Sequence, residues 1–181
     1  YGGLSFPISQ RIINYIHENC DPGEEKSLVL KGYAGIAQDI LAGPWGVHPY
    51  DRNLVRRALK LGDVYNMSVY IPMKAHELME MGNREAGQLL GELAEMAEVY
   101  DTNYGRLANL THSALYAYKF RELERAVSLG EQAFRFIRGT LGNKPGQLMS
   151  YSVKARAQVL QGELGEAEKT LQIAAELASE D

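Results

Sequence analysis

Residues 151–178, YSVKARAQVLQGELGEAEKTLQIAAELA, contain a ladder of mostly small residues at fixed spacings. Its members are Ala155, Gly162, Ala167, Leu171 and Ala174, so that the steps are 7, 5, 4 and 3 residues. Two earlier stretches repeat these steps, at Ala75, Gly82, Gly87, Gly91 and Ala94, and at Ala114, Arg121, Ala126, Gly130 and Ala133. The copies start 39 residues apart (75 to 114) and 41 apart (114 to 155). A pattern that recurs at such a period is typical of a solenoid of helical hairpins.

The ladder has a mechanical explanation in a helical hairpin. A small residue midway along the first helix allows the second helix to approach, and a turn former such as Gly82 ends the first helix. Small residues in the second helix then allow the next hairpin to pack against it. Because these crossings are close, we expect replacement of Ala126 or Ala167 by Leu to cost roughly 1–3 kcal/mol through overpacking.

Apolar residues recur at helical spacing along the whole chain, and no stretch alternates as a strand would. Asp51 is placed to cap a helix at its N-terminus. Pro72 lies near the expected start of its helix, and we expect it to bend or delay that start. The pattern predicts a single all-α domain over 1–181, with about nine helices in antiparallel pairs and the clearest repeats at 66–100, 105–141 and 147–180. The expected helices span about 5–19, 24–42, 51–61, 63–81, 84–100, 104–119, 121–141, 147–161 and 164–179.

Composition limits the classes of function. The net charge is −4, which disfavours a general nucleic-acid-binding surface, and no stretch reaches the roughly 18 continuous apolar residues of a membrane span. The single cysteine, Cys20, cannot form an internal disulfide, which fits a reducing compartment and predicts a cytoplasmic protein. Since the chain begins without Met, we interpret it as a piece of a longer protein.

Signatures of chemistry are missing from the sequence. It has no HExxH, no CxxC, no phosphate loop and no GxSxG, so we expect no metal, no cofactor and no enzyme activity. An enzyme would have to bring His76, His112 and nearby carboxylates together in one pocket. One helix carries a small basic run, which we interpret as a solvated face rather than a phosphate contact: Arg52, Arg56, Arg57 and Lys60.

The ladder resembles the tetratricopeptide repeat, in which a small residue lies midway in helix A, Gly forms the turn, and Ala, a bulky residue and Ala follow along helix B. The copy with Ala155, Gly162 and Ala167 matches best and has Tyr151 at the early aromatic position. The middle copy has Arg121 at the turn position, the terminal Pro is missing, and the period exceeds the family's 34 residues. The resemblance implies a right-handed α-α superhelix, similar to the arrays in large bacterial signalling ATPases and transcription regulators.

In this family the first helix of each pair lines the concave face, and the resemblance therefore implies a partner-binding groove. The groove would hold an extended peptide or an amphipathic helix. Two alternatives stay open: some of these residues, Leu115 among them, are interhelical core, and the loop of Trp45 is either a contact site or a plug over a helix end. The expected groove residues are His76, Met79, Thr111, Leu115, Tyr118, Lys119, Ser152 and Arg156.

These expectations favour a non-catalytic interaction scaffold that docks a partner protein, a peptide or another domain of its parent chain. The alternative is a regulatory module of a bacterial signalling or transcription protein that senses a peptide or small ligand. Glycines inside helices, at Gly87, Gly91 and Gly130, favour this alternative because they could soften the array. A homodimer through the end helices is compatible with both.

Overall fold

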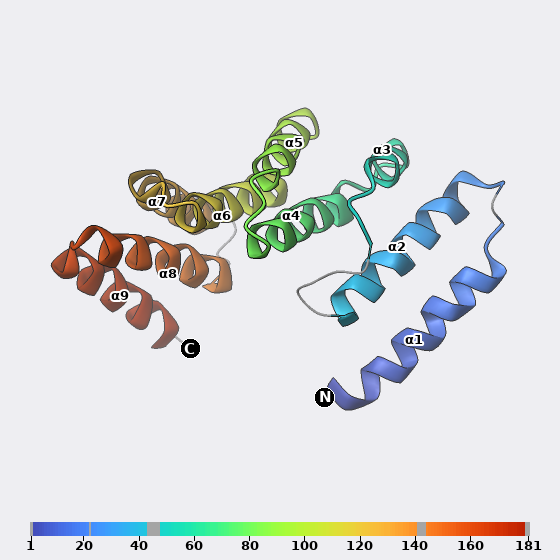
Figure 1. Cartoon of the computed structure of the whole chain (residues 1–181), viewed down its shortest axis with the longest axis horizontal. Helices are drawn as coiled ribbons and strands as arrows, with labels where there is room; N and C mark the ends of the chain where they lie inside the picture. The colour runs from blue at the N-terminus through green and yellow to red at the C-terminus, as the bar shows by residue number, and fades with distance from the viewer. Residues whose placement is uncertain (1, 22, 43–47, 141–143, 180–181) are drawn as a thin grey trace.

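A computed structural model describes residues 2–21, 23–42, 48–140 and 144–179, and in this part of the chain all regular structure is α-helical (Figure 1). No helix in these ranges is both long enough and apolar enough to cross a bilayer. The helices are α1 (Gly2–Asn19), α2 (Glu25–Ala42), α3 (Arg52–Lys60), α4 (Val64–Glu80), α5 (Ala86–Val99), α6 (Asn103–Lys119), α7 (Leu123–Thr140), α8 (Lys144–Gln161) and α9 (Leu164–Ser179).

The predicted helices agree with these bounds to within three residues. The two largest differences are at starts: α1 begins at Gly2, and α8 begins at Lys144 instead of residue 147. The early start of α8 takes Pro145 into its first turn, where proline is tolerated because that N–H has no helical acceptor. Trp45 lies outside the described residues.

The cap predicted at Asp51 is confirmed. Its carboxylate Oδ1 accepts hydrogen bonds from the backbone N–H groups of Asn53 (2.8 Å) and Leu54 (3.1 Å). The expectation that Pro72 delays the start of its helix is wrong, because α4 begins at Val64 and continues through Pro72 to Glu80. The cost is a helical hydrogen bond, since Pro72 has no N–H to offer to the carbonyl four residues before it.

The turn position of the ladder has a left-handed backbone in all three copies. The φ angle is +70° at Gly82, +66° at Arg121 and +82° at Gly162. In each copy the N–H of the next residue donates to the carbonyl five residues before it, the bond of a Schellman cap. These bonds are Asn83 to Leu78 (2.8 Å), Glu122 to Ala117 (2.8 Å) and Glu163 to Gln158 (2.9 Å). The three hairpins are therefore closed in the same way.

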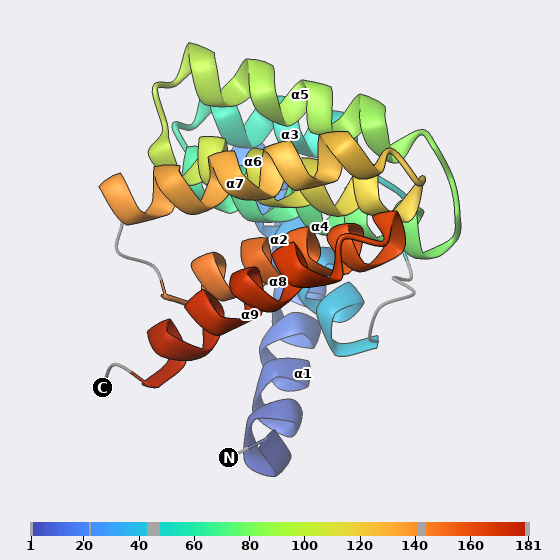
Figure 2. The same cartoon turned by 90° about the vertical axis from the view of Figure 1, so that its left-hand side faces the viewer.

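The helices form two rows from α4 onward. Each helix packs against the next along the chain, and α6 also packs against α4 and α8 (Figures 1 and 2). We call α4, α6 and α8 the inner row, because they pack against one another, and α5, α7 and α9 the outer row. In the described part of the chain α5 and α7 do not form such a packed pair. The helices α1 to α3 extend the chain by packing between sequence neighbours.

Several of the ladder's small residues lie where helices cross. Ala75, Ala114 and Ala155, the midpoints of the inner helices, are at most 2% exposed. Gly130 is also buried, and a Cβ atom built there would lie 3.0 Å from the backbone oxygen of Ser150 in α8. These residues thus allow close approach between neighbouring helices, as the sequence predicts. The prediction is wrong for Gly91, which is exposed and has no atom of another helix within 4 Å of a Cβ built on it.

Large side chains fill the space between the crossings. Met67, Ile71 and Leu93 are among the largest fully buried side chains where α4, α5 and α6 meet. Between α7 and α8 the rings of Phe134 and Tyr151 stack with their centroids 3.9 Å apart. Burial of one aliphatic side chain such as Ile71 or Leu93 contributes about 1.5–3 kcal/mol. These contacts therefore hold the two rows of helices together.

Candidate interaction surface on the inner row

The eight residues predicted for the groove all lie on the inner helices, but two of them are interior. Met79 is 2% exposed and belongs to the main core cluster. Thr111 is 4% exposed, and its Oγ1 donates to the Leu107 carbonyl at 3.0 Å. Their helical positions face a neighbouring helix instead of solvent, so we exclude both from the surface.

Half-exposed residues near the C-terminal ends of α4 and α6 form an ion cluster around Glu80. The ammonium of Lys119 lies 2.7 Å from Glu80 Oε1, and His76 Nε2 lies 3.4 Å from the same oxygen. The hydrogen bond from Lys119 lowers the pKa of the Glu80 carboxyl, which therefore stays ionised. Leu115 packs partly buried against the main core, as the alternative interpretation of this residue expects.

The two histidines named for an enzyme site are adjacent in the structure. The His76 and His112 rings meet edge to face with their centroids 6.3 Å apart. Burial lowers the pKa of His112, and its Nδ1 lies 2.8 Å from the Ala108 carbonyl oxygen. Glu80 is engaged by Lys119 as a carboxylate and is thus not a proton donor near neutral pH. In the described ranges no three His, Cys, Asp or Glu side chains are arranged to hold a metal ion.

A pocket of about 240 Å³ lies between α6, α8 and α9, and we call it the inner pocket. Three of the predicted residues meet in it, namely Tyr118, Ser152 and Arg156. Its remaining wall is apolar and open to solvent: the exposed fractions are 48% at Val159, 44% at Leu160 and 52% at Leu171. Its lining combines a phenol, a hydroxyl and a guanidinium with exposed aliphatic side chains.

Sequence reasoning missed Leu160 and Leu171 as members of this surface. The resemblance assigns the groove to the first helix of each pair, whereas Leu171 comes from α9. Leu171 takes the ladder position that Gly130 takes in α7, where α8 covers it. No described helix covers α9 in the same way, so the bulky side chain at this position remains exposed.

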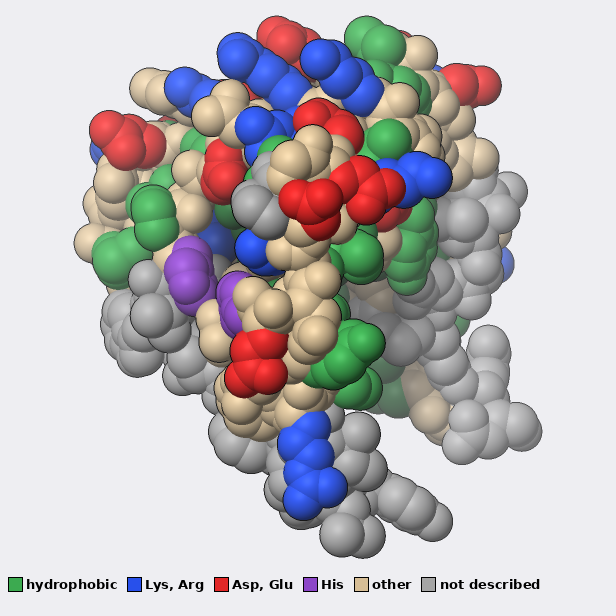
Figure 3. All heavy atoms as spheres, turned by 90° about the vertical axis from the view of Figure 1, so that its right-hand side faces the viewer, with side chains coloured by type: hydrophobic (Ala, Val, Ile, Leu, Met, Phe, Trp, Pro, Cys, Tyr) green, Lys and Arg blue, Asp and Glu red, His purple; other side chains and the backbone are tan. Residues whose placement is uncertain are grey.

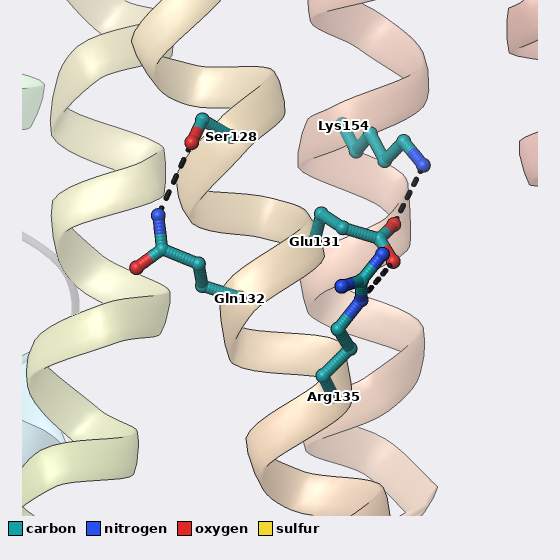
Figure 4. A network of polar contacts seen from close by, with 5 residues as sticks. All are labelled: Ser128, Glu131, Gln132, Arg135 and Lys154. Carbon is teal, nitrogen blue, oxygen red and sulfur yellow. Dashed lines mark hydrogen bonds and ion pairs between the residues drawn. The ribbon is translucent and has the colours of Figure 1, made fainter.

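A polar network fixes α8, which carries most of the inner pocket, against α7 (Figure 4). The carboxylate of Glu131 accepts from Lys154 Nζ at 2.8 Å through one oxygen and from Arg135 Nε at 2.8 Å through the other. The hydrogen bond from Lys154 is the main cause that lowers the pKa of the Glu131 carboxyl, which therefore keeps its charge. Since Lys154 lies two residues from Ser152 and Arg156, the network helps to set their orientation.

The basic run on α3 is neutralised in part by acidic neighbours. Arg52 Nη2 lies 2.6 Å from Glu92 Oε1, and Arg57 Nε lies 3.6 Å from Glu25 Oε1. Figure 3 shows basic and acidic side chains interspersed on the end of the molecule that carries α3. A mixed surface of this kind supports the interpretation as a solvated face.

Comparisons with family models, with curated proteins and with solved structures found no significant match to this chain.

Proposed function

We propose that the chain is a cytoplasmic, non-catalytic interaction module whose inner row docks a partner protein or another domain of its parent chain. The observation that carries the proposal is the inner pocket, where three predicted residues meet three exposed aliphatic side chains. Apolar side chains gathered on a surface are typical of contact sites, because their burial against a partner is favourable. Arg156 adds a planar guanidinium that suits a partner carboxylate.

We further propose that the array is a right-handed superhelix of the tetratricopeptide type. Two features support this: the same cap at Gly82, Arg121 and Gly162, and the packing of α6 against both α4 and α8. An inner row of this kind presents a continuous face to a ligand, as helical solenoids do. The partner segment would lie along α8 and end against Leu171.

The test is a quantitative affinity capture with two matched double variants. Arg156→Glu/Leu171→Glu changes two exposed residues of the inner pocket. Arg56→Glu/Leu61→Glu makes the same changes at an exposed position of α3 and at the exposed residue that caps its C-terminus. Leu115 is not substituted in this test, because it packs against the core and its replacement would also lower the stability of the fold. We expect the first variant to lose a partner that the parent chain and the control retain, with all three showing the same circular dichroism. Retention of every partner by the pocket variant would refute this role of the inner pocket.

A further inference from the structure

A second, apolar hollow lies away from the inner pocket, on the outer row. It has a volume of about 770 Å³ and opens between α5 and α7, with α6 as its floor. Figure 1 shows α6 between these two helices. We call this hollow the outer groove and define it by its apolar lining, which includes Ala94, Ala97, Leu110 and Phe136.

The outer groove follows from the way in which the two rows pack. The inner helices contact one another, whereas the outer helices α5 and α7 do not form a packed pair in the described structure. On the inner side of the array, α8 packs against both α6 and α7. In the groove between α5 and α7, by contrast, no helix of the described residues packs against both walls.

The walls of the outer groove fit the approach of a helix. Ala94 and Ala97 are small, and Gly91, one turn before Ala94, has open space around its Cα. Small residues allow two helix axes to come within the usual 8–10 Å or closer. The hollow accommodates several aliphatic side chains along one face of a helix, with Leu110 as the contacting apolar side chain on its floor.

The acidic charge of the α5 wall favours basic side chains beside the apolar face of the docked helix. Glu95 and Glu98 line the groove and are exposed. Between residues 85 and 105 the chain contains five acidic residues and no Lys or Arg. Among the described lining residues the guanidinium is that of Arg106, which lies 2.8 Å from Asp101 and 3.7 Å from Glu98 and so faces acidic side chains already.

We propose that the outer groove is a second docking site, which takes an amphipathic helix of a partner with Lys or Arg beside its apolar face. The basic flank lies against Glu95 and Glu98, and the apolar side chains contact Leu110 and Ala94. This site is independent of the inner pocket, because the two share no lining residue.

The probe is a displayed library of 16-residue amphipathic helices with a fixed leucine stripe and randomised flanks, selected on the folded chain. We expect the recovered helices to be enriched in Lys and Arg on one flank. As a synthetic peptide, the best helix should lose affinity about tenfold on the charge reversal Glu95→Lys/Glu98→Lys, and its affinity should fall as salt is raised. These two residues are exposed, so the variant should keep its fold.

Two further variants locate the site. Leu110→Glu, which places a charge on the groove floor, should lower the affinity at least tenfold, while Arg156→Glu/Leu171→Glu in the inner pocket should leave it unchanged. Recovery of helices without a basic bias, or of none at all, would overturn the proposal. So would an affinity that is insensitive to both Leu110→Glu and the charge reversal, or one that is lost only with the inner-pocket variant.

Discussion

Two glycines at the same ladder position should respond in opposite ways to the same substitution. Gly91 in α5 and Gly130 in α7 both lie inside helices, where replacing Gly by Ala stabilises by about 1 kcal/mol through helix propensity. No atom other than its own helix and chain neighbours lies within 4 Å of a Cβ at Gly91, so we expect this gain in full for Gly91→Ala.

The gain at Gly130 is offset by a clash with α8. A Cβ there would lie 3.0 Å from the Ser150 carbonyl oxygen and 3.1 Å from the Lys154 Cβ. The first of these is a backbone atom of a helix that packs against α6, α7 and α9, so it yields little. Overpacking of this kind costs roughly 1–3 kcal/mol, and the net effect of Gly130→Ala is a loss of about 1 kcal/mol.

Thermal and urea unfolding of the two variants beside the parent chain checks the difference. For a chain of this size 1 kcal/mol corresponds to about 2–4 °C in Tm, so Gly91→Ala should raise Tm and Gly130→Ala should lower it by a few degrees. Equal stabilisation by both substitutions would refute the close crossing of α7 and α8 at Gly130. A loss of stability in Gly91→Ala would contradict the open surroundings of Gly91.

Three further predictions concern stability. Burial lowers the pKa of His112 below its usual 6.5, so as the pH falls below about 6.5 the unfolded state binds a proton that the folded state resists. The free energy of unfolding, measured by urea titration, should therefore fall between pH 7.5 and 5.5. The substitution His112→Gln should reduce this pH dependence. Lys74 Nζ lies 2.9 Å from the Glu77 carboxylate in the interior, and Lys74→Met would leave that buried carboxylate unpaired. This variant should therefore lower the unfolding free energy by about 3–5 kcal/mol in the same assay, whereas Lys74→Met/Glu77→Leu should recover most of the loss. Arg121 has a left-handed backbone that favours glycine, so Arg121→Gly should raise the unfolding free energy by about 1 kcal/mol, and an unchanged Tm would contradict that strain.

The sequence predicted the helices and their turns because local patterns determine both. Gly82 and Gly162 marked two of the left-handed turns, and the spacing then assigned the same role to Arg121, which composition alone would not suggest. The early start of α8 was missed because a proline at position 145 is compatible with either a loop or a first helical turn.

The site was predicted less completely, since exposure depends on how each helix is rotated against its neighbours. Successive residues of a helix are about 100° apart, so a small error in phase places Met79 and Thr111 in a groove when they lie in the core. The outer groove was missed for another reason. It depends on the separation of α5 from α7, and no local pattern in the sequence encodes that distance.

Site-specific photo-crosslinking tests the central proposal, docking on the inner row, most directly. A benzoylphenylalanine residue in place of Ser152 lies in the inner pocket, and one in place of Arg56 lies on the exposed face of α3. We expect a discrete crosslinked partner from position 152 and none from position 56, with the adduct at 152 lost when Leu171→Glu is added. Equal crosslinking from both positions, or none from position 152, would contradict docking on the inner row.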